Sequence, residues 1–134
     1  MTIEPHLWFD DLAAGVEWYR SVLGFSVTAS HPEDSPTWFK MEREGAAIML
    51  AITPPPSQAV GGQQFLSSVA HRLKGEGAPM SLYLHVEDAS AEHDRAVAGG
   101  GVVIEALWDA WWGGRQFTVE DPAGSWWTVF EPTD

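Results

Sequence analysis

The spacing of apolar residues changes once within the first 25 positions of the chain. Leu7 and Phe9 alternate with His6 and Trp8, which is the period of a half-buried β-strand. The apolar positions that follow have the spacing of one helix face: Leu12, Val16, Tyr19 and Leu23. Gly24 then suits the C-terminal cap of a helix. The segment therefore predicts a strand, a helix and a terminating glycine.

The same order returns 77 residues later. A second alternation places aliphatic residues on either side of Tyr83 and His85, and these are Leu82, Leu84 and Val86. Acidic residues before each helix offer N-caps: Asp10 and Asp11 before the first, and Asp88 before the second. The second helix is predicted to end in Gly99–Gly101, and a shift of 77 places Gly24 on Gly101.

Each half of the chain closes with a strand, a turn and a second strand, over residues 39–53 and 117–132. A shift of 79 places Gly45 on Gly124 and Met49 on Thr128. Because internal repeats decide the architecture, the chain predicts an α+β fold of two βαβββ modules. An open sheet of this kind buries one face under its helix, so we expect the remaining faces to form a curved mixed-sheet cup.

The expected domain organisation is a single domain over residues 1–134. The first module spans 1–53 and the second spans 80–134. A Pro- and Gly-rich connector over 54–79 separates them, and Gln63 to Leu73 is predicted to form a short helix within it.

Strand parity predicts which side chains line the cup, because alternate residues of a strand point to opposite faces. The residues expected under the helices are Leu7, Phe9, Leu82, Leu84, Val86, Phe117 and Val119. The residues expected to face the cup are Glu4, His6, Trp8, Met49, Ser81, Tyr83, His85, Thr118, Glu120, Trp126 and Thr128. His31 is predicted in a polar loop, and His93 is predicted to pack beneath its helix.

Three segments resemble the vicinal oxygen chelate superfamily, which includes glyoxalase I, extradiol dioxygenases and the bleomycin resistance proteins. Residues 8–25, "WFDDLAAGVEWYRSVLGF", are similar to the family's opening strand and helix. Residues 82–101, "LYLHVEDASAEHDRAVAGGG", are similar to the start of its second module. Residues 113–132, "GGRQFTVEDPAGSWWTVFEP", are similar to its closing hairpin. The resemblance implies paired βαβββ modules, and usually a homodimer.

Enzymes of that superfamily usually hold a divalent metal with His and Glu side chains from four strands. The resemblance places those four positions on Glu4, Met49, Ser81 and Thr128. Met and Thr are poor ligands for a hard or borderline divalent ion, so the family's chelate site is predicted to be missing and no cofactor is expected. The alternative is a displaced site of His6 and His85 with Glu4 or Glu120; otherwise the two imidazoles hydrogen-bond in a polar cavity.

Tryptophans are concentrated near the C-terminus, where five of the chain's eight are found. Trp127 is predicted under a helix, and Trp126 in the cup with Trp8. Trp108, Trp111 and Trp112 are predicted in a loop at the rim of the cup. Exposed indoles need a cover, which is either a partner subunit or a flat ligand.

The charge and composition of the chain restrict which partners and sites are expected. Seven Lys and Arg against 19 Asp and Glu give a formal charge of −12, which disfavours nucleic acid and anionic membranes. The absence of cysteine excludes disulfides, thiolate metal sites and a cysteine nucleophile. No apolar run approaches the roughly 20 residues of a membrane span, and no signal peptide is seen, so a cytoplasmic location is expected.

The leading functional hypothesis is sequestration of a small aromatic compound, neutral or cationic, without a metal, as in bleomycin resistance proteins. The predicted ligand contacts are His6, Trp8, Met49, Tyr83, His85, Trp108, Trp111, Trp112, Thr118 and Trp126. One alternative is a metal-dependent glyoxalase- or dioxygenase-type enzyme that uses the displaced site. Another is a catalytically silent protein that makes only protein contacts.

Overall fold

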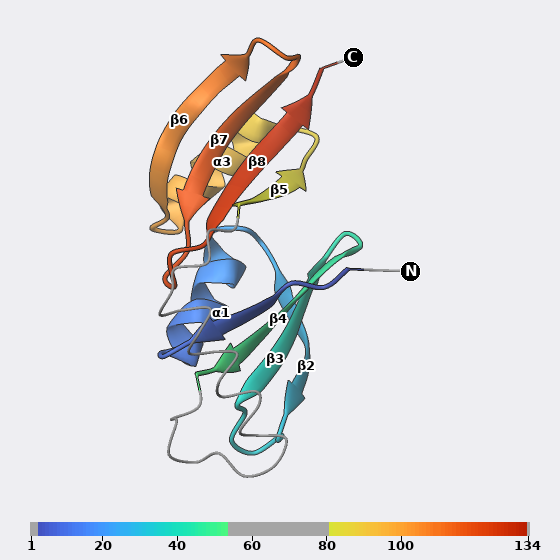
Figure 1. Ribbon diagram of the computed structural model, residues 1–134, viewed down its shortest axis with the longest axis vertical. Coiled ribbons are helices and arrows are strands. Elements are labelled where there is room, and N and C mark those ends of the chain that lie inside the picture. The colour runs from blue at the N-terminus through green and yellow to red at the C-terminus, as the bar shows by residue number, and fades with distance from the viewer. Residues whose placement is uncertain (1–2, 54–80, 134) are drawn as a thin grey trace. The chain divides into compact units, whose positions relative to one another are not determined.

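The computed structural model describes residues 3–53 and 81–133 (Figure 1). In this part of the chain the strands form two four-stranded sheets. Contacts divide the described residues into two units: residues 3–16 with 25–53, and residues 17–24 with 81–133. The connector 54–79, including the predicted helix from Gln63 to Leu73, lies outside the described residues.

The sheet of the first unit has the strand order β1-β4-β3-β2. Its strands are β1 (His6–Phe9), β2 (Ser26–His31), β3 (Trp38–Arg43) and β4 (Ala46–Ile52). β1 pairs with β4 in parallel, and the other pairs are antiparallel. Helix α1 (Leu12–Ser21) follows β1, as the change of apolar spacing predicted. His31 is the exposed last residue of β2, so its placement in a loop was wrong.

The sheet of the second unit repeats this order as β5-β8-β7-β6. Its elements are β5 (Ser81–His85), α3 (Ala89–Ala98), β6 (Val102–Ala110), β7 (Gly114–Glu120) and β8 (Trp126–Pro132). β5 pairs with β8 in parallel, and β6, β7 and β8 form an antiparallel meander. Figure 1 shows α3 lying against one face of this sheet. The predicted βαβββ modules of an α+β fold are therefore confirmed.

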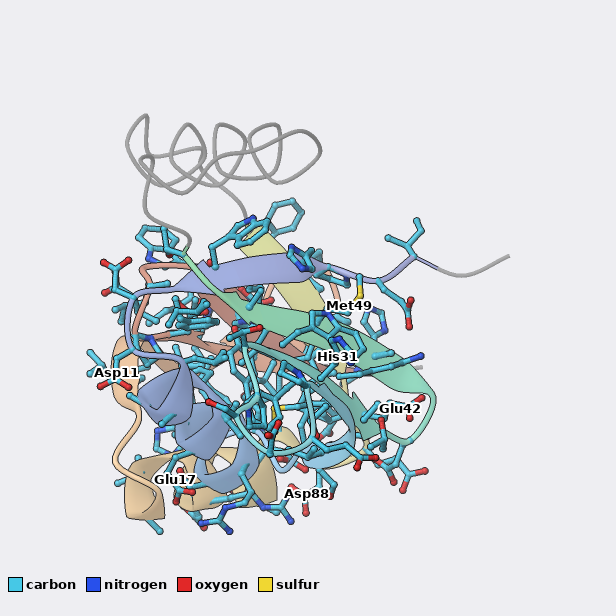
Figure 2. All side chains as sticks on the ribbon, turned by 90° about the horizontal axis from the view of Figure 1, so that it is seen from below. Asp11, Glu17, His31, Glu42, Met49 and Asp88 are labelled. Atoms are coloured by element: carbon cyan, nitrogen blue, oxygen red, sulfur yellow. The ribbon has the colours of Figure 1, made fainter. Side chains whose placement is uncertain are left out.

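Capping residues fix the helix ends. Asp11 lies at the start of α1 (Figure 2), and its Oδ1 accepts a hydrogen bond of 3.0 Å from the Ala14 N–H. Asp88 caps α3 in the same way, through a 3.0 Å bond from the Ala91 N–H. Gly24 has a φ of 74°, as a C-terminal cap requires. After α3 the left-handed glycine is Gly100, with a φ of 82°, one residue before the Gly101 that the shift of 77 aligns with Gly24.

Strand registers confirm the repeat in detail. His6 lies opposite Met49 in the first sheet, and Tyr83 lies opposite Thr128 in the second. The two hairpin glycines that the shift of 79 aligned both have a left-handed backbone, with φ of 89° at Gly45 and 91° at Gly124. The two sheets therefore offer equivalent positions for different side chains.

The core of each unit lies on one side of its sheet. Buried residues of the first unit's strands are Leu7, Phe9, Met41, Ile48 and Leu50. Those of the second unit's strands are Phe117, Val119, Trp127 and Val129. From α3, Ala89 and Ala96 are buried, and the ring of His93 meets Phe117 edge-on at 5.2 Å, as predicted for this histidine. The opposite sheet faces are left for other roles. No helix in the described ranges is long and apolar enough to cross a membrane.

Candidate functional site

The face of the second sheet opposite α3 carries two rows of side chains that run across the strands. One row follows the register from β5 to β6 and consists of Tyr83, Thr128, Thr118 and Glu105; we call it the polar row. The next row consists of His85, Phe130, Gln116 and Trp108; we call it the ring row. These residues alternate along the strands with the buried core, so they point away from α3.

A directed chain of hydrogen bonds connects the polar row. The Thr118 hydroxyl donates to Glu105 Oε1 at 3.1 Å. That bond uses the only hydroxyl proton of Thr118, so Thr128 is the donor in the 2.9 Å contact between the two hydroxyls. Gln116 Nε2 donates to the same Glu105 oxygen at 3.0 Å. Two neutral side chains, Gln116 and Thr118, therefore donate directly to one carboxylate, and Thr128 donates to Thr118 behind them.

The ionisation of Glu105 reflects this arrangement. Partial burial raises the pKa of its carboxyl, but hydrogen bonds from Gln116 and Thr118 and the nearby indole of Trp108 outweigh that effect. The net result is a pKa of Glu105 below its usual value. Glu105 is therefore an anion at neutral pH, and it lies on a face whose neighbouring polar residues are buried: Gln116, Thr118 and Thr128 are 3%, 6% and 5% exposed.

Two polar atoms on this face are buried and have no hydrogen-bond partner within the described chain: Gln116 Oε1 and Trp108 Nε1. Buried polar groups are nearly always paired, so each such atom calls for a reason. The Gln116 amide cannot simply be reversed, because its oxygen would then face the acceptor oxygen of Glu105. Gln116 Oε1 therefore keeps acceptor capacity that the described residues do not use, whereas the Trp108 indole already lowers the pKa of Glu105.

Indole rings cluster beside this face. Trp108 lies within β6, not in the loop predicted for it, because β6 extends to Ala110. Trp111 and Trp112 lie in the turn between β6 and β7, as expected. The Trp112 ring meets Trp108 edge-on at 5.3 Å and Trp111 at 5.2 Å. Trp111 is 87% exposed and Trp112 is 45% exposed, so the turn presents aromatic surface to solvent.

The β5–β8 side of the face is also aromatic. Tyr83 and Trp126 are about half exposed, at 52% and 49%. The Phe130 ring contacts Tyr83 at 6.0 Å and His85 at 5.4 Å between ring centroids. This ring also lies against Gly114, where an added Cβ would come within 2.3 Å of it. Only glycine at position 114 leaves room for the Phe130 ring in this orientation.

The equivalent face of the first sheet has different chemistry. His6 and Trp8 meet edge-on with ring centroids 4.3 Å apart, and partial burial lowers the pKa of His6. Met49 lies in register with both His6 and Lys40 (Figure 2 marks Met49). Lys40 Nζ forms an ion pair with Glu4 at 2.9 Å. The Glu4 carboxylate on this face is therefore already paired with a lysine.

The side chains at the positions that the family resemblance assigned to metal binding are poor metal ligands or already have partners. Glu4 is engaged by Lys40, Met49 supplies a thioether, and the Thr128 hydroxyl donates to Thr118. His6 belongs to the first unit, and His85 and Glu120 belong to the second. No group of three or more His, Asp or Glu side chains able to hold a metal occurs within residues 3–53 and 81–133.

Trp127 has a structural role within the second unit. It is buried, and its Nε1 donates to the Tyr19 hydroxyl at 2.8 Å. Tyr19 donates in turn to Asp121 Oδ2 at 2.5 Å, and Asp121 Oδ1 accepts from the N–H groups of Ala123 and Ser125. Burial and the neighbouring Asp121 raise the pKa of Tyr19 well above its usual value. The expectation that Trp127 lies under a helix is confirmed.

Sequence reasoning missed Glu105, Gln116 and Phe130. Parity would have identified two of them, since Gln116 lies two residues before Thr118 and Phe130 two residues after Thr128. Glu105 carries no such signal, because β6 has register shifts on both sides of it. Parity counting fails across such irregularities.

Comparisons with known proteins agree with this architecture. Residues 4–129 match the family model described as the Glyoxalase/Bleomycin resistance protein/Dioxygenase superfamily. An uncharacterized protein of Mycobacterium bovis is 31% identical over 134 residues, which cover 97% of this chain and 82% of the relative.

Solved structures share the fold at lower identity. TioX from Micromonospora sp. ML1 is 21% identical with a TM-score of 0.75, over 98% of each chain. TnmS3, an antibiotic binding protein from Streptomyces sp. CB03234, is 20% identical with a TM-score of 0.63, over 99% of this chain and 98% of TnmS3. By its family match and its two βαβββ modules, the chain belongs to the Glyoxalase/Bleomycin resistance protein/Dioxygenase superfamily.

Proposed function

We propose that this protein binds a small aromatic compound on the face of the second sheet opposite α3, without a metal, and sequesters it. The observation that carries the proposal is the combination of the polar and ring rows with exposed rings around them. On such a face, buried polar atoms orient the ligand, and the rings provide apolar contact area for it. Ligand sites commonly combine an apolar, aromatic lining with a few placed polar groups.

Exposed aromatic surface supports a ligand on this face. Tyr83, Trp126 and Trp112 are each about half exposed, and Trp111 is exposed almost completely. Large exposed apolar patches usually mark sites of interaction. Flat rings stack against such side chains and displace water from them. We therefore assign ligand contacts to these four residues together with His85, Trp108 and Thr118, while His6, Trp8 and Met49 remain predicted contacts on the face of the first sheet.

The side chains on this face favour binding of a ligand over catalysis. The two hydroxyls belong to Thr118 and Thr128, and Thr128 donates to Thr118, which donates to Glu105. The pKa of Glu105 lies below its usual value, so this carboxylate is a weak base and activates neither hydroxyl strongly. TnmS3, which shares the fold, is an antibiotic binding protein, so antibiotic binding has a precedent among structures of this fold. We propose that drug resistance by sequestration is the biological role of this chain, as a homodimer in the cytoplasm.

The test is a screen of planar aromatic compounds by quenching of tryptophan fluorescence, followed by calorimetry on the hits. Saturable binding with one ligand for each chain, and recovery of the unmodified compound afterwards, is the expected result. Elemental analysis after dialysis separates this function from metal catalysis. Stoichiometric metal that is lost on combining His6→Ala with His85→Ala, together with turnover of a hit, would replace the proposal with an enzyme.

A further inference from the structure

Glu105 is an ionised carboxylate that has only neutral partners. Gln116 Nε2 and the Thr118 hydroxyl both donate to its Oε1. No Lys, Arg or His side chain pairs with Glu105 in the part of the chain that the structure describes. The half-buried carboxylate on the first sheet, Glu4, does have such a partner in Lys40. The negative charge on the second sheet is therefore left for a cation from outside the unit.

Gln116 adds a second acceptor beside this charge. Its side chain is 3% exposed, its nitrogen is committed to Glu105, and its Oε1 has no partner among the described residues. A buried amide oxygen without a partner is unfavourable unless a bound molecule supplies the hydrogen. A group that carries more than one N–H can satisfy the Gln116 oxygen and the Glu105 carboxylate together.

The neighbouring ring defines what else the ligand carries. Trp108 lies in register with Gln116, and Trp112 packs edge-on against Trp108 at 5.3 Å. Indole faces attract cations and stack on flat conjugated groups. A metal ion fits this place poorly, because one carboxylate and one amide oxygen fall well short of the about six to eight oxygen ligands that calcium takes.

We infer that Glu105 and Gln116 anchor a planar cationic hydrogen-bond donor of the amidinium or guanidinium class, joined to an aromatic ring that lies against Trp108 and Trp112. The inference rests on the proposed function, to which it adds the chemical class of the ligand. One N–H of the cation donates to Glu105 and another to Gln116 Oε1. Charge-assisted bonds of this kind are shorter and stronger than neutral ones, and planar donors suit carboxylates best.

The experiment compares two probes of nearly equal shape, naphthalene-2-carboxamidine and naphthalene-2-carboxamide, by isothermal calorimetry on the full chain. Both probes carry the ring and N–H donors, and only the amidine is charged. Wild type should bind the amidine at least 10-fold more tightly than the amide. Glu105→Gln should reduce that preference to about 2-fold or less, since it neutralises the anchor without changing its size.

Matched variants separate the anchor from general charge and from folding. Glu44→Gln removes the same charge from the turn between β3 and β4, where the Glu44 side chain is 85% exposed, and should keep the preference for the amidine. Gln116→Leu removes the amide and should weaken the amidine about 5-fold or more. The melting temperature of each variant establishes that it is folded before the titrations are compared.

Each outcome of the titrations supports or overturns the proposed anchor. Equal affinity of wild type for both probes, or an unchanged preference in Glu105→Gln, overturns the anchor and leaves aromatic binding in place. Absence of binding by either probe up to about 5 mM overturns the anchor as well. In that case the fluorescence screen decides separately whether the proposed function fails with it.

Discussion

The two sheets of this protein have the same strand order, yet equivalent positions carry a charged residue in one sheet and a neutral residue in the other. The repeat aligns Met49 with Thr128. Lys40 on β3 lies opposite Met49, and Thr118 on β7 lies opposite Thr128. Lys40 reaches a carboxylate on its own face and pairs with Glu4. Thr118 instead donates a neutral hydrogen bond to Glu105. The same backbone thus gives one face on which a carboxylate pairs with a lysine and another on which the Glu105 anion has only neutral partners.

The comparison indicates which sheet face can still bind a charged ligand after folding. An ion pair at 2.9 Å uses the charges of both partners, whereas neutral donors stabilise an anion and leave its net charge in place. The two faces also differ in exposed rings. Tyr83 and Trp126 of the second sheet are exposed, whereas the equivalent residues of the first sheet, His6 and Ala47, are half-buried. Four predictions test this contrast, from the largest expected effect to the smallest.

The largest effect concerns the buried side of the two sheets. Trp127 and Ile48 occupy equivalent buried positions, but only Trp127 donates a hydrogen bond, to Tyr19. Trp127→Phe should lower the free energy of unfolding by roughly 2–3 kcal/mol, because it removes volume and leaves the Tyr19 cluster without a donor. Ile48→Val should lower it by about 1 kcal/mol. Urea unfolding measures both, and equal losses would contradict the assigned asymmetry.

The next effect concerns the exposed rings of the second unit. Trp112→Ala should weaken binding of an aromatic ligand by about 1–3 kcal/mol, the scale of a lost stacked or cation–π contact, and Trp111→Ala should act in the same direction. The melting temperature should change little, because both residues lie in an exposed turn. Calorimetric titration and thermal melts are the measurements. If the two variants weaken a dimer in sedimentation and bind ligand as wild type does, the rings form a subunit interface instead.

A smaller effect depends on pH. The pKa of Tyr19 is raised above its unfolded value by burial and by Asp121, so its contribution to stability is full below about pH 10 and is lost as pH rises toward its folded pKa. Between pH 9.5 and 10.5 wild type should lose roughly 0.5–1 kcal/mol more than Tyr19→Phe. Urea unfolding at each pH measures this difference. Parallel losses in the two proteins would exclude Tyr19 as the titrating group.

The smallest effect concerns the ion pair of the first sheet. Glu4 and Lys40 are each about one third exposed, with side-chain exposures of 30% and 32%, so solvent screens their attraction. Glu4→Gln should lower stability by about 0.5 kcal/mol or less, and salt should reduce the difference from wild type. Preference for a cationic probe should be unaffected. A loss of that preference in Glu4→Gln would place the cation on the first sheet rather than on Glu105.

Several parts of the site were within reach of sequence reasoning. The alternation of Leu82, Tyr83, Leu84 and His85 already separates core from face, because strand side chains alternate regardless of context. Asp11 and Asp88 were identified as caps because their short carboxylates suit free N–H groups at a helix start. By contrast, Trp108 was assigned to a loop because the glycines at 113 and 114 suggested an early break, while β6 continues to Ala110.

By itself, the sequence determined the repeated βαβββ order and the helix caps. These depend on local spacing and on side-chain chemistry, which the chain carries into any environment. Only the tertiary structure decided that Glu105, Thr118 and Gln116 meet on one face. Their contact depends on pairing between β6 and β7 and on the two register shifts that reorient β6. Such pairing is a property of neighbouring strands, so no periodicity within one strand records it.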